Sequence, residues 1–349
     1  YNFEKPKSSL NSATEFRELS VSSGARIVGD ITGKLDRPNA SLFLKKGKAE
    51  EVRDLANELC ANLVIFNHEL SPSQERNLET LFGIRVLDRT GLILHIFASR
   101  ASSHVGKLQV ELAQLTHLST RLVRGWSHLE RQKGGIGLRG PGETQLETDR
   151  RLIGQRIKTI KKRLEKTHNQ KEVNRYSRKK SRNKLAAIVG YTNAGKTTLF
   201  NALTDNSQYA ADKPFATLDS VTRKNAIPEL GPILFSDTVG FISDLPTQLI
   251  ESFKATLDEL RAADLLVHVV DIADENFHFK VDQVIKLLAE LNLSHIPILR
   301  VNNKSDKAGI IDYRSLSMPD KGDVWVSAEN KEGLEELIDS INIFLRGDL

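Results

Sequence analysis

One stretch of eight residues limits the folds open to this chain, because it joins an apolar strand to a helix through a glycine-rich loop. It has a glycine, four further residues and then Gly-Lys-Thr, over Gly190–Thr197. The apolar run Leu185–Val189 predicts a strand before it, and Thr198–Leu203 predicts a helix after it. Backbone N–H groups of such a loop would surround a phosphate at a helix N-terminus, where the dipole favours anions. We therefore expect an α/β P-loop domain with a mostly parallel sheet and flanking helices.

Two more segments supply the chemistry that a bound phosphate chain needs. The strand Ile233–Asp237 ends in a carboxylate that begins Asp-Thr-Val-Gly, and the N–H of Gly240 could donate to a γ-phosphate. Between the two motifs, Thr217 can cover the γ-phosphate and Mg²⁺. The candidate catalytic residues are Lys196, Thr217 and Gly240. The candidate Mg²⁺ ligands are Thr197, Thr217 and Asp237.

Two later segments predict that the base is guanine. The strand Pro297–Asn302 leads into Asn303-Lys304-Ser305-Asp306, where a carboxylate can accept two hydrogen bonds from guanine. Adenine offers no such pair of donors, so a buried Asp306 would be left unpaired and ATP rejected. The strand Asp323–Val326 is followed by residues whose backbone can meet guanine O6. The expected GTP contacts are Gly190, Tyr191, Thr192, Asn193, Ala194, Gly195, Lys196, Thr197, Thr198, Phe215, Ala216, Thr217, Leu218, Asp219, Asp237, Thr238, Val239, Gly240, Asn303, Lys304, Ser305, Asp306, Ser327, Ala328 and Glu329.

Residues 1–100 alternate strand and helix patterns and predict a small N-terminal α/β domain with a largely parallel sheet. Ser71-Pro72 resembles an N-cap followed by a proline at the first helical position. The expected strands are Ser41–Leu44, Asn62–Phe66 and Ile84–Asp88, and the expected helices are Glu50–Ala61 and Ser73–Phe82. The single cysteine, Cys60, excludes an internal disulfide and is expected in the core.

Residues 101–184 have a helical pattern on both sides of a glycine-rich segment, and predict an antiparallel helical hairpin with its tip at 134–143. The tip could bind a nucleotide, be a plain turn, or insert into a narrow site on a large partner. The net charge of +5 is uneven, because Arg150–Lys184 has fifteen Lys and Arg and two Glu. This basic second helix is either a solvated face or a binding face for the RNA backbone. The G domain is expected over 185–349.

Three strings resemble the HflX family of ribosome-associated GTPases. They are Asp-Arg-Thr-Gly-Leu-Ile-Leu at Asp88–Leu94, Gly-Lys-Leu-Gln-Val-Glu-Leu at Gly106–Leu112, and Arg131–Glu147, which includes the glycine-rich tip. With the GTPase motifs, the resemblance covers roughly residues 40–349. It implies binding to the large ribosomal subunit and its rRNA, with the glycine-rich loop pointing toward the peptidyl-transferase region. It also implies splitting of stalled or stress-inactivated ribosomes.

The expected function is therefore a GTP-hydrolysing, ribosome-stimulated switch. Phe241 stands where many GTPases have a water-orienting glutamine, so the missing group must come from a neighbouring loop, a cation or the partner. The alternative is that Phe241 packs into the core and a nearby polar residue already orients the water in the free protein. Asn193 could hold K⁺ or stabilise its own turn. Alternatives are a ribosome-biogenesis GTPase, an RNA-remodelling NTPase and a signalling GTPase with a protein effector.

The composition bounds the setting of this activity. No apolar run reaches membrane-spanning length. The single cysteine fits a reducing compartment, so we expect a cytoplasmic protein, with peripheral membrane association as an alternative. We also expect a monomer when the protein is free of partners. The chain begins with Tyr1 rather than Met, so its natural N-terminus is expected to be missing.

Overall fold

The computed structural model describes residues 9–35, 37–132, 141–180, 184–204, 214–215, 220–227, 231–243, 246, 249, 252, 260–308 and 323–346. The chain forms two compact units. The first unit comprises residues 1–99, 107–165 and 246–252, and the second unit comprises residues 100–106, 166–245 and 253–349.

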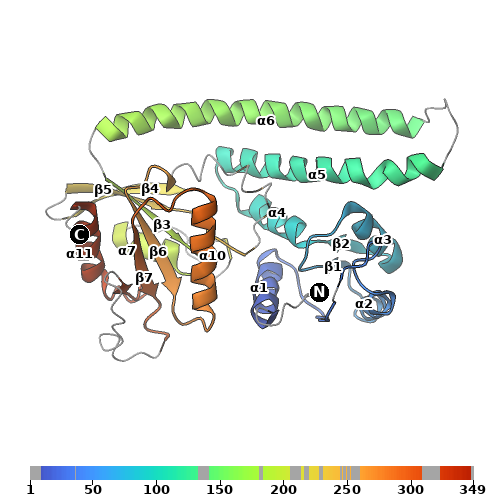
Figure 1. The fold of residues 1–349 in the computed structure, drawn as a ribbon, viewed down its shortest axis with the longest axis horizontal. Helices are drawn as coiled ribbons and strands as arrows, with labels where there is room; N and C mark the ends of the chain where they lie inside the picture. The colour runs from blue at the N-terminus through green and yellow to red at the C-terminus, as the bar shows by residue number, and fades with distance from the viewer. Residues whose placement is uncertain are drawn as a thin grey trace. The chain divides into compact units, whose positions relative to one another are not determined.

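The second unit is built on a six-stranded sheet with the strand order β4-β5-β3-β6-β7-β8. Strand β4 runs antiparallel to β5, and every other neighbouring pair is parallel. The strands are β3 (Lys184–Gly190), β4 (Val221–Ile227), β5 (Gly231–Asp237), β6 (Leu265–Asp271), β7 (Ile298–Asn303) and β8 (Val324–Trp325), and the helices are α7 (Lys196–Thr204), α10 (Phe277–Glu290) and α11 (Leu334–Arg346) (Figure 1). This is the P-loop GTPase fold that the sequence predicts.

The core of the second unit lies on the sheet face that α7 and α11 cover. Alternate residues of β6, Leu265, Val267 and Val269, are fully buried there. Helix α11 contributes apolar side chains at a spacing of four, including Leu337 and Ile341. The central strand β3 therefore has buried neighbours on both sides, and its C-terminal end is held rigidly where the glycine-rich loop begins.

The first unit combines a short parallel pair of strands with several helices. Strands β1 (Leu63–Ile65) and β2 (Arg85–Leu87) pair in parallel, as predicted. Helix α3 begins at the predicted cap, because the Gln74 N–H donates to the Ser71 hydroxyl at 3.2 Å and the Ser71 N–H donates to the Gln74 side chain at 2.9 Å. The helices are α1 (Ser9–Ser22), α2 (Lys46–Glu58), α3 (Pro72–Phe82), α4 (Arg89–Arg100), α5 (His104–Gln132) and α6 (Pro141–Lys180), the last two extending into the second unit.

Two expectations for the first unit are wrong. Ser41–Leu44 is a turn rather than a strand, because the Asn39 side chain accepts hydrogen bonds from the N–H groups of Ser41 and Leu42. Phe43 then has a left-handed backbone, with φ at 61°, and only an isolated bridge to Asn39. Cys60 is exposed, because α2 ends at Glu58 and the cysteine lies beyond it with φ at 51°.

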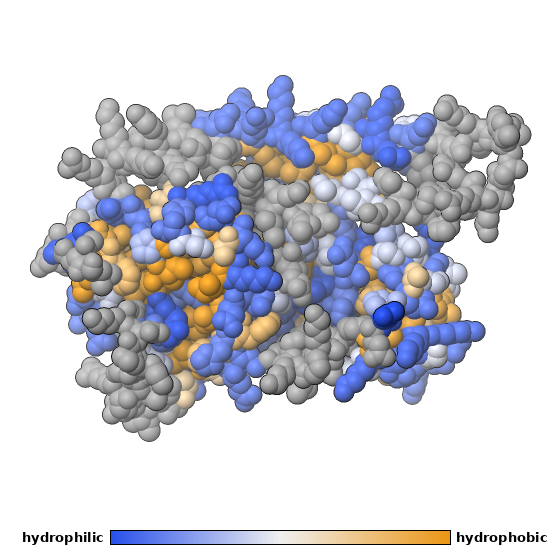
Figure 2. All heavy atoms as spheres, viewed as in Figure 1, coloured by the Kyte–Doolittle hydropathy of each residue, from blue (hydrophilic) through white to orange (hydrophobic). Residues whose placement is uncertain are grey.

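Helices α5 and α6 lie side by side within the first unit (Figure 1). Leu108, Leu112 and Ile160 are buried together between them, and Arg156 donates two hydrogen bonds to Glu111 at 2.6 and 3.0 Å. Figure 2 shows hydrophilic side chains along the outer side of α6 and hydrophobic ones beneath. Residues 134–140 of the expected tip lie outside the described part, whereas 141–143 belong to α6, which begins at a proline suited to a first helical position.

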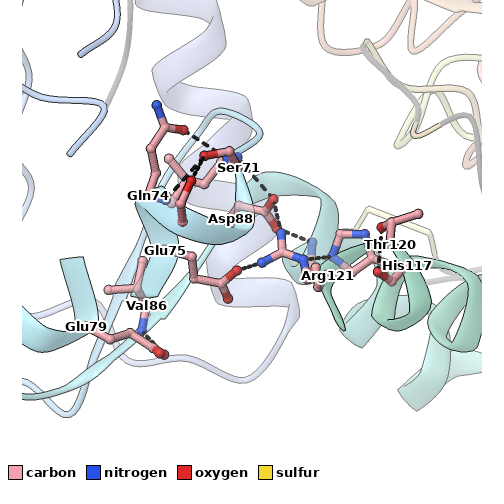
Figure 3. Close-up of polar contacts among 12 residues, drawn as sticks. Ser71, Gln74, Glu75, Glu79, Val86, Asp88, His117, Thr120 and Arg121 are labelled. Atoms are coloured by element: carbon pink, nitrogen blue, oxygen red, sulfur yellow. Dashed lines mark hydrogen bonds and ion pairs between the residues drawn. The ribbon is translucent and has the colours of Figure 1, made fainter. Parts of the chain in front are cut away.

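An ion cluster around the buried Asp88 fixes α5 to the rest of the first unit (Figure 3). The carboxylate of Asp88, which is 1% exposed, accepts hydrogen bonds from the Gly91 N–H at 2.7 Å and from Arg121 of α5 at 2.6 Å. The same guanidinium pairs with Glu75 of α3 and donates to His117 Nε2 at 2.7 Å. Burial lowers the pKa of His117, although the nearby Asp88 carboxylate opposes this, so a neutral acceptor fits here.

We expect Arg121→Met to destabilise the first unit by about 3–5 kcal/mol, because two carboxylates would remain in place without their cation. Arg156→Met is the matched control, since it removes an arginine whose side chain is 47% exposed and should change stability little. Urea denaturation of the full chain followed by circular dichroism measures both variants. Equal unfolding midpoints for the two would show that the cluster does not anchor α5.

Candidate functional site

The glycine-rich loop leaves the C-terminal end of β3 and enters α7, as the sequence predicts. Two of its glycines are required by close approaches. A Cβ at Gly190, whose φ is 152°, would lie 2.3 Å from the carbonyl oxygen of Val269. One at Gly195, whose φ is 89°, would lie 2.2 Å from the side-chain nitrogen of Asn303. The loop thus packs directly against β6 and the end of β7, with Asn193 in a left-handed conformation at its turn.

Lys196 is buried within this loop. Its ammonium donates to the carbonyl oxygen of Tyr191 at 2.7 Å. Burial lowers the pKa of Lys196 to about 8, an effect that Asp237 opposes and Lys304 adds to. A phosphate oxygen beside this ammonium would supply negative charge, which stabilises the protonated lysine in these low-dielectric surroundings. The position therefore suits a group that neutralises phosphate.

A hydroxyl oxygen from the first turn of α7 and a carboxylate oxygen from the end of β5 lie within hydrogen-bonding distance. The Thr197 hydroxyl donates to a carboxylate oxygen of Asp237 at 2.8 Å, and both residues are buried. Thr238 beside them donates to the carbonyl oxygen of Ile188 at 2.7 Å, which ties this segment to β3. Hydroxyl and carboxylate oxygens are the donors that Mg²⁺ prefers. The donor set of Thr197 and Asp237 fits that ion.

The predicted guanine-binding segments converge on Asn303 at the end of β7. Its amide nitrogen donates to the carbonyl oxygen of Ala194 at 2.9 Å, and its amide oxygen accepts from the Ala328 N–H at 3.0 Å. Lys304 pairs with Asp271 at 2.7 Å, and the Ser305 N–H donates to the Val326 carbonyl oxygen at 3.3 Å. Four loops distant in the sequence are thereby assembled into one site.

Asp306 is exposed, and its expected burial against a guanine base stays a prediction. Asp306 comes directly after Ser305, whose N–H donates to the Val326 carbonyl oxygen. It lies at the surface of the described chain. Glu329 is exposed as well, whereas Ser327 and Ala328 are buried.

The predicted residues between the phosphate loop and the end of β5 are described only in part. Ala216, Thr217, Leu218 and Asp219 lie outside the described residues, while Phe215 before them is buried with φ at 58°. Gly240 is buried and Val239 half-buried. Phe241 is 3% exposed, so its ring does pack inside the protein.

The sequence reasoning missed His268 in β6, although a histidine inside the apolar run Leu265–Asp271 was a visible signal. The side chain is buried. Burial, together with the cations Arg300 and Lys196, lowers the pKa of His268 to about 4. It is therefore neutral at physiological pH and adds no positive charge beneath the phosphate loop.

Comparisons with known proteins agree with this geometry. Family models match residues 10–98 (GTP-binding GTPase N-terminal), 100–178 (GTP-binding GTPase Middle Region) and 185–304 (50S ribosome-binding GTPase). The GTPase HflX of Escherichia coli is 50% identical over 339 residues, which are 96% of this chain and 79% of that protein. The GTPase HflX of Alkalihalophilus pseudofirmus is 47% identical, covering 96% and 79%.

A solved structure supports the fold over the whole chain. The crystal structure of an SsGBP and GDP complex covers 95% of both chains with a TM-score of 0.51 and 27% identity. Among the described residues, no helix is both long and apolar enough to cross a membrane.

We expect Asp306→Asn to weaken GTP binding roughly tenfold or more, because hydrogen bonds to a charged acceptor are worth about 1.5–3 kcal/mol. An asparagine amide can instead donate to the 2-oxo group of a xanthine base. Titration calorimetry with GTP, ATP and XTP measures all three affinities. Lost GTP binding with gained XTP binding identifies a base contact, whereas an unchanged preference for GTP over ATP would remove Asp306 from the base site.

Proposed function

Because the chain belongs to the HflX family of GTPases, we propose that it binds the large ribosomal subunit and acts there as a GTP-dependent switch. Its role would be to dissociate or rescue stalled or stress-inactivated ribosomes. The observation that carries the proposal is the exposed basic side of α6, in a chain whose second unit matches a ribosome-binding GTPase family. Its alternatives are ribosome biogenesis, RNA remodelling and signalling through a protein effector.

The residues of the second unit would divide the work on GTP between them. Lys196 would neutralise the β- and γ-phosphates, and Asp306 would accept hydrogen bonds from guanine. Thr197 and Asp237, with Thr217, would hold Mg²⁺, which when bound neutralises charge on the phosphates. Gly240 would donate its N–H to the γ-phosphate. Loss of that phosphate would release the segments around Thr217 and Gly240, which is the switch.

The basic side of α6 would supply the RNA footprint. Lys158, Lys161 and Lys162 are exposed, whereas Ile157 and Ile160 on the other side of the helix pack toward α5. Exposed lysines bind phosphate through charge and carry no sequence information. This suits a folded rRNA whose backbone is the ligand.

Asn193 has two possible roles that experiment separates. Its left-handed backbone, with φ at 64°, is typical of an asparagine that stabilises its own turn. By analogy with cation-dependent GTPases, its side chain could instead coordinate K⁺ beside the phosphates. Turnover in KCl and in NaCl at equal ionic strength decides between them, since a turn residue alone gives equal rates.

We propose three functional parts with the boundaries that the sequence suggests: 1–100, 101–184 and 185–349. The first would carry further ribosome contacts, the second the basic helix, and the third GTP. We also propose a cytoplasmic protein that is monomeric when free of the ribosome.

We expect slow intrinsic hydrolysis that rises by orders of magnitude on adding large ribosomal subunits, as when arginine fingers are supplied in trans. The physical reason is that the buried phenyl ring of Phe241 can neither donate a hydrogen bond to the attacking water nor accept one. Single-turnover GTP hydrolysis with and without subunits is the measurement.

Small subunits and a nuclease-treated lysate serve as controls for that experiment. Stimulation by large subunits alone supports the proposal. Fast hydrolysis by the free protein, unaffected by ribosomes, would contradict it. Stimulation that survives removal of all RNA would favour a protein effector instead.

We expect replacement of Lys161 and Lys162 by Gln to weaken binding to large subunits and to flatten its salt dependence. Each lost phosphate contact removes roughly 0.7–0.9 of a unit from the slope of log K against log salt. The matched control replaces the exposed Lys286 and Lys331 of the second unit by Gln. Sedimentation binding at several KCl concentrations measures both. If the two double variants behave alike, the basic side of α6 is only a solvated face.

A further inference from the structure

Tyr191 is an aromatic residue inside the phosphate loop, and its side chain makes contacts that GTP binding does not explain. The ring is 4% exposed. Its hydroxyl accepts a hydrogen bond from the Ser243 N–H at 2.9 Å. The ammonium of Lys280, on α10, lies 5.2 Å from the ring centroid, within the range of a cation–π contact. One side chain thus joins the phosphate loop to the segment beyond Gly240 and to a helix.

The backbone on either side of Tyr191 makes the same connection. The Phe241 N–H donates to the carbonyl oxygen of Gly190 at 3.0 Å, and the Thr192 N–H donates to that of Phe241 at 2.7 Å. With the hydroxyl of Tyr191, three hydrogen bonds tie residues 241–243 to residues 190–192. Any residue at position 191 could keep the two backbone bonds, whereas the third needs a tyrosine hydroxyl.

Gly240 stands immediately before this three-bond connection and close to the phosphate-binding ammonium. A Cβ at Gly240 would lie 2.9 Å from Lys196 Nζ. The backbone of Gly240 is thus placed within the phosphate site by residues that follow it in the chain. Anything that loosens residues 241–243 would loosen Gly240 as well.

Lys280 is itself held in place over the ring. Its ammonium pairs with Asp274, whose carboxylate also accepts the Asn276 N–H at 2.8 Å. Burial alone would raise the pKa of Asp274, but the hydrogen bonds from Lys280 and Asn276 lower it overall. The aspartate stays ionised, and so keeps the ammonium beside the ring.

We infer that Tyr191 is a positioning residue for GTP hydrolysis. Its hydroxyl holds Ser243, and through it Gly240, at the distance from Lys196 at which the Gly240 N–H meets a γ-phosphate. This inference rests on the role proposed above for Gly240. GDP has no γ-phosphate, so the contact matters for GTP and for the hydrolysis step but not for GDP.

Tyr191→Phe tests this, because it removes the hydroxyl and keeps the ring and both backbone bonds. We expect the ratio of GTP to GDP affinity and the single-turnover rate at saturating GTP each to fall roughly three- to tenfold, as for one lost hydrogen bond. GDP affinity should stay unchanged, and the thermal unfolding midpoint should fall by no more than the few degrees that one lost hydrogen bond costs. Titration with fluorescent GTP and GDP analogues and rapid-quench hydrolysis, on the full chain without ribosomes, measure these.

Lys280→Met provides a second test through the ring rather than through the hydroxyl. It should also lower the ratio of GTP to GDP affinity and the single-turnover rate, by a smaller factor than Tyr191→Phe. Lys286→Met, an exposed lysine on the same helix, is its matched control and should change neither.

The outcomes separate this inference from the role of Gly240. Equal losses of GTP and GDP affinity in Tyr191→Phe would make Tyr191 a merely structural residue and overturn the inference, as would no change in either. Gly240→Ala is measured alongside. If Gly240→Ala leaves the GTP-to-GDP ratio intact, the proposed role of Gly240 fails first. If it lowers the ratio and Tyr191→Phe does not, only the positioning role fails.

Discussion

The buried amide of Asn303 is the contact on which the nucleotide site depends. It is 2% exposed, donates to the carbonyl oxygen of Ala194 in the glycine-rich loop, and accepts from the Ala328 N–H in the last of the loops proposed to bind the base. A buried amide left with an unpaired donor or acceptor costs about 1–3 kcal/mol. Both loops are therefore held to the end of β7 by one side chain, and Gly195 must be a glycine because the amide occupies the space of its Cβ. The distance between phosphate and base subsites is thus set by packing within the protein.

The parts of this fold that the sequence predicts are those whose signals are local. The N-cap at Ser71 and the glycine-rich loop after a buried strand follow from neighbouring residues, and the parallel pairing of β1 with β2 follows from the alternation of strand and helix patterns along the chain. The strand predicted at Ser41–Leu44 is wrong because the Asn39 side chain accepts hydrogen bonds from this segment and closes a turn. The prediction that Cys60 lies in the core is wrong because α2 ends two residues earlier, at Glu58, and the chain then turns to the surface. The hydrophobic periodicity of the sequence does not by itself predict either the turn at Asn39 or the end of α2.

The candidate site divides in the same way. Motif spacing identified the segments of Lys196, Asp237 and Asn303, which the sheet does bring together, although their roles toward GTP remain predictions. It could not show that the hydroxyl of Tyr191 reaches Ser243, because that contact spans 52 residues and depends on how the chain turns after β5. Nor could it show that Asp306 is exposed. For Phe241, the structure shows that the ring packs inside the protein, whereas the source of the group that orients the attacking water stays a prediction.

The charges around the phosphate loop predict that nucleotide binding and protonation are coupled. Burial holds His268 neutral and lowers the pKa of Lys196 to about 8, so the free site limits its own positive charge. A phosphate bound against Lys196 favours the ammonium and raises its pKa again. Below pH 8 the lysine is already protonated and binding needs no proton. Above pH 8 binding must take one up, so the affinity for phosphate falls as pH rises through that value. We therefore expect the burial of Lys196 to weaken phosphate binding above about pH 8.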